Sequence, residues 1–253
     1  MNIRCVAGIF TFACFFCCTV AAQELTLDQI HKKNEDAIGG ADAISKVQTL
    51  RMTSRMLMSD GQTEMVMTVS SKRPNFVRAD TSVMGYNVVW VYDGANAWMI
   101  NPLTGGSEPQ KMDDNTVARL TGARMDSSIG SLIGIKAAGN TIELLGKEDV
   151  NNSPAYKLKV TIKGGVNSTY FLDAGTFLPV KIIAKVSMMG QEVEGETYPG
   201  DYKKVGGILF AHSMEAHVNG QTVRMNYDKI EVNVPLDDSF FKLPGTETPA
   251  IKK

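Results

Sequence analysis

Apolar and polar residues alternate through most of the chain between residues 50 and 232, and this pattern predicts β-strands. It is clearest in residues 155–163, where apolar side chains hold the even positions and lysine or threonine holds most odd ones. Turn-forming pairs such as Asp93-Gly94 and Asn219-Gly220 join neighbouring strands. The sequence therefore predicts one antiparallel meander, strongly curved toward a barrel. The predicted strands are residues 50–58, 64–70, 76–80, 86–92, 97–100, 141–147, 155–163, 169–173, 180–186, 192–198, 208–218 and 222–232.

Two helices are predicted before the first strand. Thr26 can cap the free amides of the first helix, and Gln29 occupies the position of a capping-box partner. Gly39-Gly40 ends this helix, and a short second helix follows over residues 41–47. The fold class is therefore mainly β with helices (α+β).

The segment 102–140 interrupts the meander. One helix is predicted from Asp113 or Asp114 to Leu120, and a second begins at Asp126. A connection of this length between strands is usually functional. A mobile lid over the sheet and a fixed plug in its mouth are equally compatible with the pattern. The second helix carries apolar residues at helical spacing, namely Ile129, Leu132 and Ile133.

Residues 1–22 have the pattern of an export signal. Arg4 supplies a positive charge, an uncharged and mostly apolar run follows, and small residues precede Gln23. All four cysteines lie in this segment, so residues 23–253 have no thiol for a disulfide or a metal site. A retained membrane anchor and lipidation at Cys14 are the alternatives to cleavage. We expect a periplasmic protein with one domain over residues 23–253, and a monomer.

Charge and motif content narrow the function classes. The formal net charge is −1 with no basic cluster, which argues against nucleic acid as a partner. His212 and His217 are five residues apart on a predicted strand, hence on opposite faces, which argues against a shared metal. Familiar hydrolase and nucleotide-binding motifs are absent from the sequence. We therefore expect no catalytic residues, no metal and no cofactor, and a protein that is not an enzyme.

Methionines cluster on one face of the first predicted hairpin. Methionine is unbranched and polarisable, so it suits a surface that must fit flexible apolar chains of varied shape. An ordinary core that happens to use methionine is the alternative. The clustered residues are Met52, Met56, Met58, Met65 and Met67.

Two short motifs resemble the Lol-type periplasmic lipoprotein carriers (LolA/LolB-like). The first is the basic pair with its proline, Lys72-Arg73-Pro74-Asn75-Phe76, and the second is Asp93-Gly94 followed by Trp98 and Pro102. The resemblance implies a half-barrel sheet that is covered by helices and holds acyl chains under a lid. It further implies that Arg73 bonds to the lid as a latch, where the residue pattern alone is compatible with a solvated strand end. The chain differs from the family in its length and in its Gly39-Gly40 pair.

By this resemblance, the expected function is to bind the acyl chains of lipoproteins, or another lipid, and to pass them toward the outer membrane. The implied partners are an inner-membrane release complex and an outer-membrane acceptor. A regulatory or scaffold domain of the envelope that uses the same half-barrel is one alternative, and an unrecognised hydrolase is another. The predicted ligand-binding residues are Met52, Met56, Met58, Met65, Met67, Trp90, Trp98, Ile129, Leu132 and Ile133.

Overall fold

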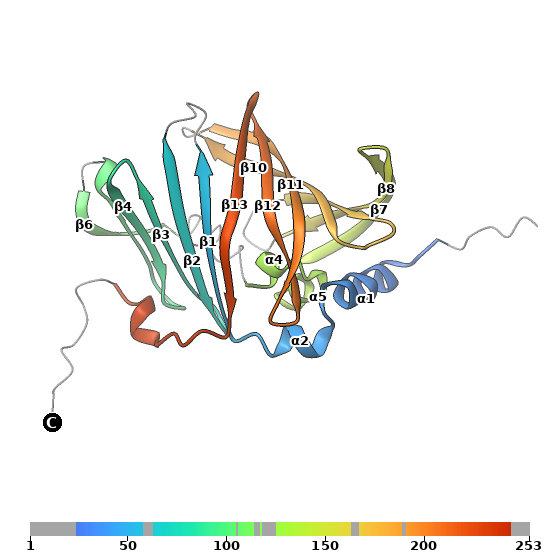
Figure 1. Cartoon of the computed structure of the whole chain (residues 1–253), viewed down its shortest axis with the longest axis horizontal. Coiled ribbons are helices and arrows are strands. Elements are labelled where there is room, and N and C mark those ends of the chain that lie inside the picture. Colours follow the sequence, from blue (N-terminus) through green and yellow to red (C-terminus); the bar gives the residue numbers. More distant parts are fainter. Residues whose placement is uncertain are drawn as a thin grey trace, which may run out of the picture.

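The computed structural model describes residues 24–57, 63–104, 106–113, 117, 125–162, 167–188 and 191–243. In this part of the chain, 13 strands form a single sheet in which every neighbouring pair is antiparallel (Figure 1). The strands are β1 Thr49–Leu57, β2 Glu64–Lys72, β3 Phe76–Val83, β4 Tyr86–Tyr92, β5 Ala97–Asn101, β6 Gly106–Lys111, β7 Thr141–Val150, β8 Ser153–Thr161, β9 Asn167–Asp173, β10 Pro179–Met188, β11 Gln191–Val205, β12 Ile208–Val218 and β13 Gln221–Val232.

The sheet is curved but open. Its strand order is β6-β5-β4-β3-β2-β1-β13-β12-β11-β10-β9-β8-β7, so two meanders join where β1 pairs with β13. The edge strands β6 and β7 do not pair with each other, and the sheet stays a half-barrel (Figure 1). The chain between them runs from one free edge to the other. The predicted curved antiparallel sheet is confirmed, but the single meander is wrong, because β1 pairs with β13 and β6 does not pair with β7.

Helices pack against one side of the sheet, which we call the inner face; the opposite side is the outer face. They are α1 Leu27–Ile38, α2 Ala41–Ser45, α4 Met125–Ile129 and α5 Leu132–Ala137, and two 3-10 turns, η1 Pro102–Thr104 and η2 Asp238–Phe241, complete the elements. The capping box of Thr26 and Gln29 at the start of α1 is confirmed. The helix predicted to start at Asp126 is two helices, because Gly130 takes φ 78° and Ser131 then caps α5. The helix predicted to end at Leu120 lies outside the described residues except for its start at Asp113 and for Val117, whose N–H donates to Asp113 O.

Sequence patterns missed one strand, β6, and made several others too short, β11 most of all. The strand β6 contains Pro109 and polar residues on both faces, and a proline is tolerated there because β6 is an edge strand. The strand β11 continues seven residues beyond the predicted 192–198, through Pro199-Gly200 and past Asp201 at φ 50°. Both errors arise because pairing with neighbours decides these segments rather than their own residue pattern.

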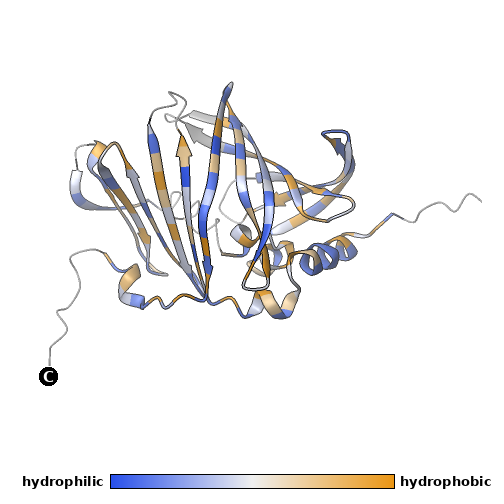
Figure 2. Ribbon diagram, viewed as in Figure 1, coloured by the Kyte–Doolittle hydropathy of each residue, from blue (hydrophilic) through white to orange (hydrophobic). Residues whose placement is uncertain are grey.

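Two buried clusters fill the inner face. The first joins α1, α2 and α4 to β1, β12 and β13, and the second joins α1 and α5 to β7, β8 and β9. Ile38 and Met125 represent the helices in the first cluster, and Ile30 and Leu132 represent them in the second. Figure 2 shows the alternating apolar and polar residues along the strands that supply the sheet side of these clusters. The helices therefore cover only the part of the inner face that these two clusters form.

Candidate functional site

A row of apolar side chains crosses the inner face beyond the helices. Directly paired residues of antiparallel strands share a face. Met56 of β1 pairs with Met65 of β2 on one side and with Met225 of β13 on the other, and Met225 pairs with Met214 of β12. On the same face, Met67 lies opposite Ser54 and Trp90 of β4 lies opposite Ala79. We call this set the methionine row: Met56, Met65, Met67, Met214, Met225 and Trp90.

The methionine row is half-buried and belongs to none of the four buried clusters of the described chain. Met52 lies on the same face of β1 as Met56, four residues nearer the helices. It is 7% exposed and packs in the first buried cluster. The inner face thus has a filled end under the helices and an apolar end that the described helices leave uncovered. The Tyr227 hydroxyl reaches Met214 Sδ at 3.6 Å, and burial raises the pKa of Tyr227 to about 12, so this phenol stays neutral.

The predicted ligand-binding residues divide among three places. Ile129 and Leu132 are fully enclosed in the filled end, and Ile133 is half-buried. Trp98 lies on the outer face, because it pairs with Val91, one strand position away from Trp90. There it packs with Val91 and Phe241, as a residue of a structural cluster. Met58 lies outside the described residues.

Arg73 joins the hairpin between β2 and β3 to the helices. Its Nε donates to Val47 O at 2.9 Å, and its two terminal nitrogens donate to the carboxylate of Asp126 at 2.8 and 3.3 Å. Its backbone N–H donates to Gln48 O at 2.9 Å, and its peptide bond to Pro74 is cis. The side chains are 29% and 14% exposed, so this two-pronged ion pair is partly shielded from water. It fixes the first turn of α4 to the sheet.

Gly134 of α5 makes room for the Asp126 carboxylate. A Cβ built on Gly134 would lie 2.6 Å from both Cβ and Cγ of Asp126. Atoms that close must move apart. From the sequence, Asp126 is predicted only as a helix start, and neither its pairing with Arg73 nor the role of Gly134 is predicted. A small pocket next to the ion pair is lined by the β2–β3 hairpin, Met125 and Asp126.

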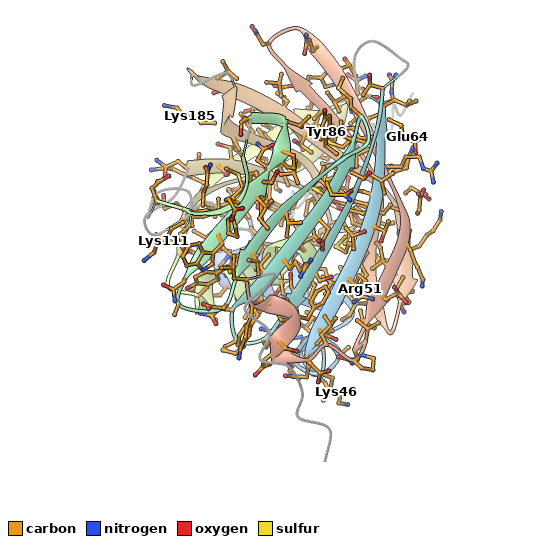
Figure 3. All side chains as sticks on the ribbon, turned by 90° about the vertical axis from the view of Figure 1, so that its left-hand side faces the viewer. Lys46, Arg51, Glu64, Tyr86, Lys111 and Lys185 are labelled. Carbon is orange, nitrogen blue, oxygen red and sulfur yellow. The ribbon has the colours of Figure 1, made fainter. Side chains whose placement is uncertain are left out.

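Exposed apolar side chains gather at the end of the sheet opposite Arg73. Leu57 ends β1, Met84 lies in the β3–β4 turn, Tyr86 begins β4, and Leu103 lies in η1 after β5. They are 54%, 68%, 49% and 46% exposed, respectively. Figure 3 shows Tyr86 and Glu64 at this end and Lys46, next to the Arg73 contact at Val47, at the other. We call Leu57, Met84, Tyr86 and Leu103 the apolar rim.

Met84 stands in a conformation that its side chain does not favour. The β3–β4 turn places Met84 at φ 51° and Gly85 at φ 78°, and such turns usually carry Asn, Asp or Gly at both positions. A methionine there gains neither burial nor a relaxed backbone. Its presence is therefore not explained by the stability of the hairpin.

The described residues contain no group of three or more acidic, histidine or cysteine side chains arranged to hold a metal ion. His212 and His217 have separate local partners, the Phe210 carbonyl and the Glu215 carboxylate. Among the helices that the structure describes, none is long and apolar enough to cross a membrane.

Comparisons with known proteins identify the fold. No family model matches the sequence, and no curated protein matches it. A putative outer-membrane lipoprotein-sorting domain from Vibrio parahaemolyticus is 13% identical, with 84% of this chain and 94% of that chain covered and a TM-score of 0.55. A DUF1329 family protein from Desulfovibrio piger is 15% identical over 85% and 96% of the two chains, at a TM-score of 0.55.

A LolA superfamily protein from Nitrosomonas europaea is 16% identical, with 87% of this chain and 99% of that chain covered, and its TM-score is 0.56. These identities are too low to transfer residue roles, but the coverage extends over nearly the whole of each structure. The predicted resemblance is confirmed for the fold alone: the open sheet of this chain is similar to the structures of a LolA superfamily protein and of a lipoprotein-sorting domain.

Proposed function

We propose that this protein binds the acyl chain of a lipoprotein, or of another lipid, against the methionine row and carries it through the periplasm toward the outer membrane. The observation that carries this proposal is the half-buried methionine row on the inner face of an open sheet. The fold shared with lipoprotein-sorting domains supports it. No covalent bond forms or breaks, so the function is binding and transfer rather than catalysis.

The methionine row suits a ligand that must be held and later released. Each buried CH₂ contributes about 0.8 kcal/mol, so a sixteen-carbon chain gains about 12 kcal/mol at most before entropy is lost. Methionine side chains adapt to chains of different length because they rotate about three bonds. A cover that competes for the same apolar face would lower the net affinity and allow release.

In this proposal the ion pair of Arg73 with Asp126 holds α4 against the filled end of the inner face, where Met52 packs in the same cluster. Separating the pair leaves a carboxylate that is 14% exposed without its main partner. Such a loss costs about 2 kcal/mol, which is small enough for a release partner to supply. The latch role of Arg73 therefore has a geometric basis in the hydrogen bonds to Asp126 and Val47.

The apolar rim would meet a lipid surface at the end of the sheet opposite Arg73. Three aliphatic or thioether side chains and one tyrosine have the composition of a membrane-interface contact. The acceptor and the release complex are expected at the outer and inner membranes, respectively.

The test compares two charge substitutions on adjacent positions of β2. Met67→Glu puts a carboxylate on the inner face, whereas Val66→Glu puts one on the outer face opposite Arg55. Both positions are half-buried. Binding of a fluorescent fatty acid should weaken at least tenfold in Met67→Glu, because a charge in the site costs several kcal/mol, and stay unchanged in Val66→Glu.

Equal binding by the two variants would refute the assignment of the inner face. Native mass spectrometry with lipid extraction, on protein taken from the envelope, identifies the natural ligand. A tight protein partner with no bound lipid would instead indicate the regulatory role.

A further inference from the structure

The sheet-facing side of α1 is unusually polar. Its buried residues include His31, Asn34 and Glu35 as well as Ile30 and Ile38. A helix that only covers a sheet normally presents an apolar stripe. Its hold on the sheet therefore depends on polar groups whose partners and charge can change.

Asn34 is fully used in holding α1 in place. Its amide nitrogen donates to Phe177 O at 3.0 Å, in the β9–β10 turn, and its amide oxygen accepts from Leu132 N at 3.1 Å, at the start of α5. The residue itself is 0% exposed. This side chain ties α1, α5 and the sheet together at a single point, next to His31.

His31 has no such partner. The residue is 3% exposed, and its Nε2 is the one buried side-chain nitrogen or oxygen of the described residues that lacks a hydrogen bond. A buried polar atom without a partner costs about 1–3 kcal/mol. Protonation would raise that cost, because the ring would then carry a positive charge and a donor on each nitrogen.

The charges around His31 act on its protonation in both directions. Lys136 of α5 and Asp28 of α1 are the charged residues that shift the pKa of His31 electrostatically. They form an ion pair with each other, with 3.5 Å between Lys136 Nζ and Asp28 Oδ1. Glu35 lies one turn further along the same face of α1. Burial first, and Lys136 second, hold the pKa of His31 below its ordinary value of 6.5, while Asp28 acts in the opposite direction.

The C-terminal end of α1 has a backbone that only glycine adopts readily. Gly39 takes φ 151° and Gly40 takes φ 87°, and a Cβ on Gly39 would lie 2.5 Å from Gly207 O. Around Gly40 there is nothing within 4 Å of a built Cβ. The helix is therefore joined to α2 through two glycines, whose N–H groups both donate to Glu35 O and whose backbone conformations other residues rarely adopt.

We propose that α1 is a pH-responsive cover: protonation of His31 undocks α1 from α5 and the sheet, with the Gly39-Gly40 link as the hinge. Docking favours the neutral ring, so the docked state is fully stable above the ordinary pKa of histidine and loses stability as the pH falls below it. Undocking removes Ile30 from the second buried cluster, and so exposes the apolar surface of α5 and of β7, β8 and β9. This inference does not depend on which ligand the protein binds.

Hydrogen exchange of the whole protein, measured by mass spectrometry at pH 7.5, 6.5 and 5.5, tests the proposal. Labelling times are scaled for the intrinsic pH dependence, and the peptide of β8 serves as internal reference. Protection of the α1 peptide relative to β8 should fall as the pH drops, by up to about tenfold for each unit by which docking depresses the pKa of His31. Unchanged relative protection in the wild-type protein would overturn the proposal.

Two variants separate His31 from general acid effects. His31→Gln stays neutral and should remove the pH dependence of α1 protection, while His212→Gln on β12 should retain it. A response in His31→Gln equal to that of wild type would overturn the proposal. A third measurement keeps His31 in place and so does not depend on whether a His31 variant folds. NMR titration of the wild-type protein should give His31 a pKa below 6.5, and Lys136→Gln should raise this pKa. A His31 pKa at or above 6.5 contradicts the mechanism.

Discussion

Gly134→Ala has two opposite effects on the free energy of unfolding, and the structure predicts which of them is larger. Within a helix this change normally stabilises a protein by about 0.5–1 kcal/mol, because alanine loses less backbone entropy than glycine. Here the new methyl group would lie 2.6 Å from Cβ and Cγ of Asp126. Because a Cβ is fixed to the backbone, Asp126 must move away together with its turn of α4, and the carboxylate moves with it. That movement breaks its two hydrogen bonds with Arg73, which are charge-assisted and worth about 1.5–3 kcal/mol in total.

The net expectation is therefore a destabilisation of about 1–2 kcal/mol instead of a gain. Urea denaturation followed by circular dichroism measures the free energy of unfolding. A Gly134→Ala protein that is more stable than wild type by 0.5 kcal/mol or more would show that Asp126 moves at no cost, and the argument would fail.

A double-mutant cycle with Arg73→Leu assigns the loss to the ion pair. Once Arg73 is replaced, Asp126 has no guanidinium to lose, so Gly134→Ala should cost at least 1 kcal/mol less in that background than in wild type. Strict additivity of the two substitutions would mean that the clash and the ion pair are independent. Hydrogen exchange in α4 should rise in Arg73→Leu while the strands stay protected, because the lost side-chain contacts join the hairpin to Asp126 and Val47 and do not join strands to each other.

Two further predictions concern the rim and the outer face. Met84→Asn should stabilise the β3–β4 hairpin by about 0.5 kcal/mol, because asparagine tolerates positive φ, yet weaken association with phosphatidylcholine vesicles. Leu145→Asn, at an exposed position of edge strand β7, is the matched control and should leave vesicle sedimentation unchanged. Phe241→Ala should cost about 3–5 kcal/mol in urea denaturation because the ring is 0% exposed, and a cost below 1 kcal/mol would contradict the packing of η2 on the sheet.

The strands were predictable because their own residues carry the alternation. The bounds of β4 and β12 match their predictions residue for residue, and each strand is followed by a clear turn, Asp93-Gly94 and Asn219-Gly220 respectively. The β3–β4 turn was not recognised from its residues, because methionine is not a residue that turns of this type favour. What remained hidden was the strand β6, whose pairing with β5 supplies what its own residues do not.

Contacts between residues that are far apart in the sequence could not be predicted from the spacing of residues along the chain. Arg73 and Asp126 are 53 residues apart, and their meeting depends on the packing of α4 against β1, β12 and β13 on the inner face. Trp98 was predicted to bind the ligand because of its motif. The register of β4 with β5 instead places its side chain on the outer face. A one-residue change of register would have exchanged the faces of Trp98 and its neighbours.

The neighbouring residues Lys72 and Arg73 each hold a different segment, on opposite faces of the sheet, and we call them the two anchors of the β2–β3 hairpin. Lys72 belongs to the outer-face set of β2, where its Nζ donates to Leu236 O and to Asp238, each at 2.7 Å, and so fixes the C-terminal segment. Arg73 is the next residue and reaches Asp126 on the inner side. The β2–β3 hairpin is thus held from both faces, and a force on the C-terminal segment would act on the hairpin that carries Arg73. Because the two anchors share one backbone, loosening the outer one should also weaken the hold of Arg73 on α4.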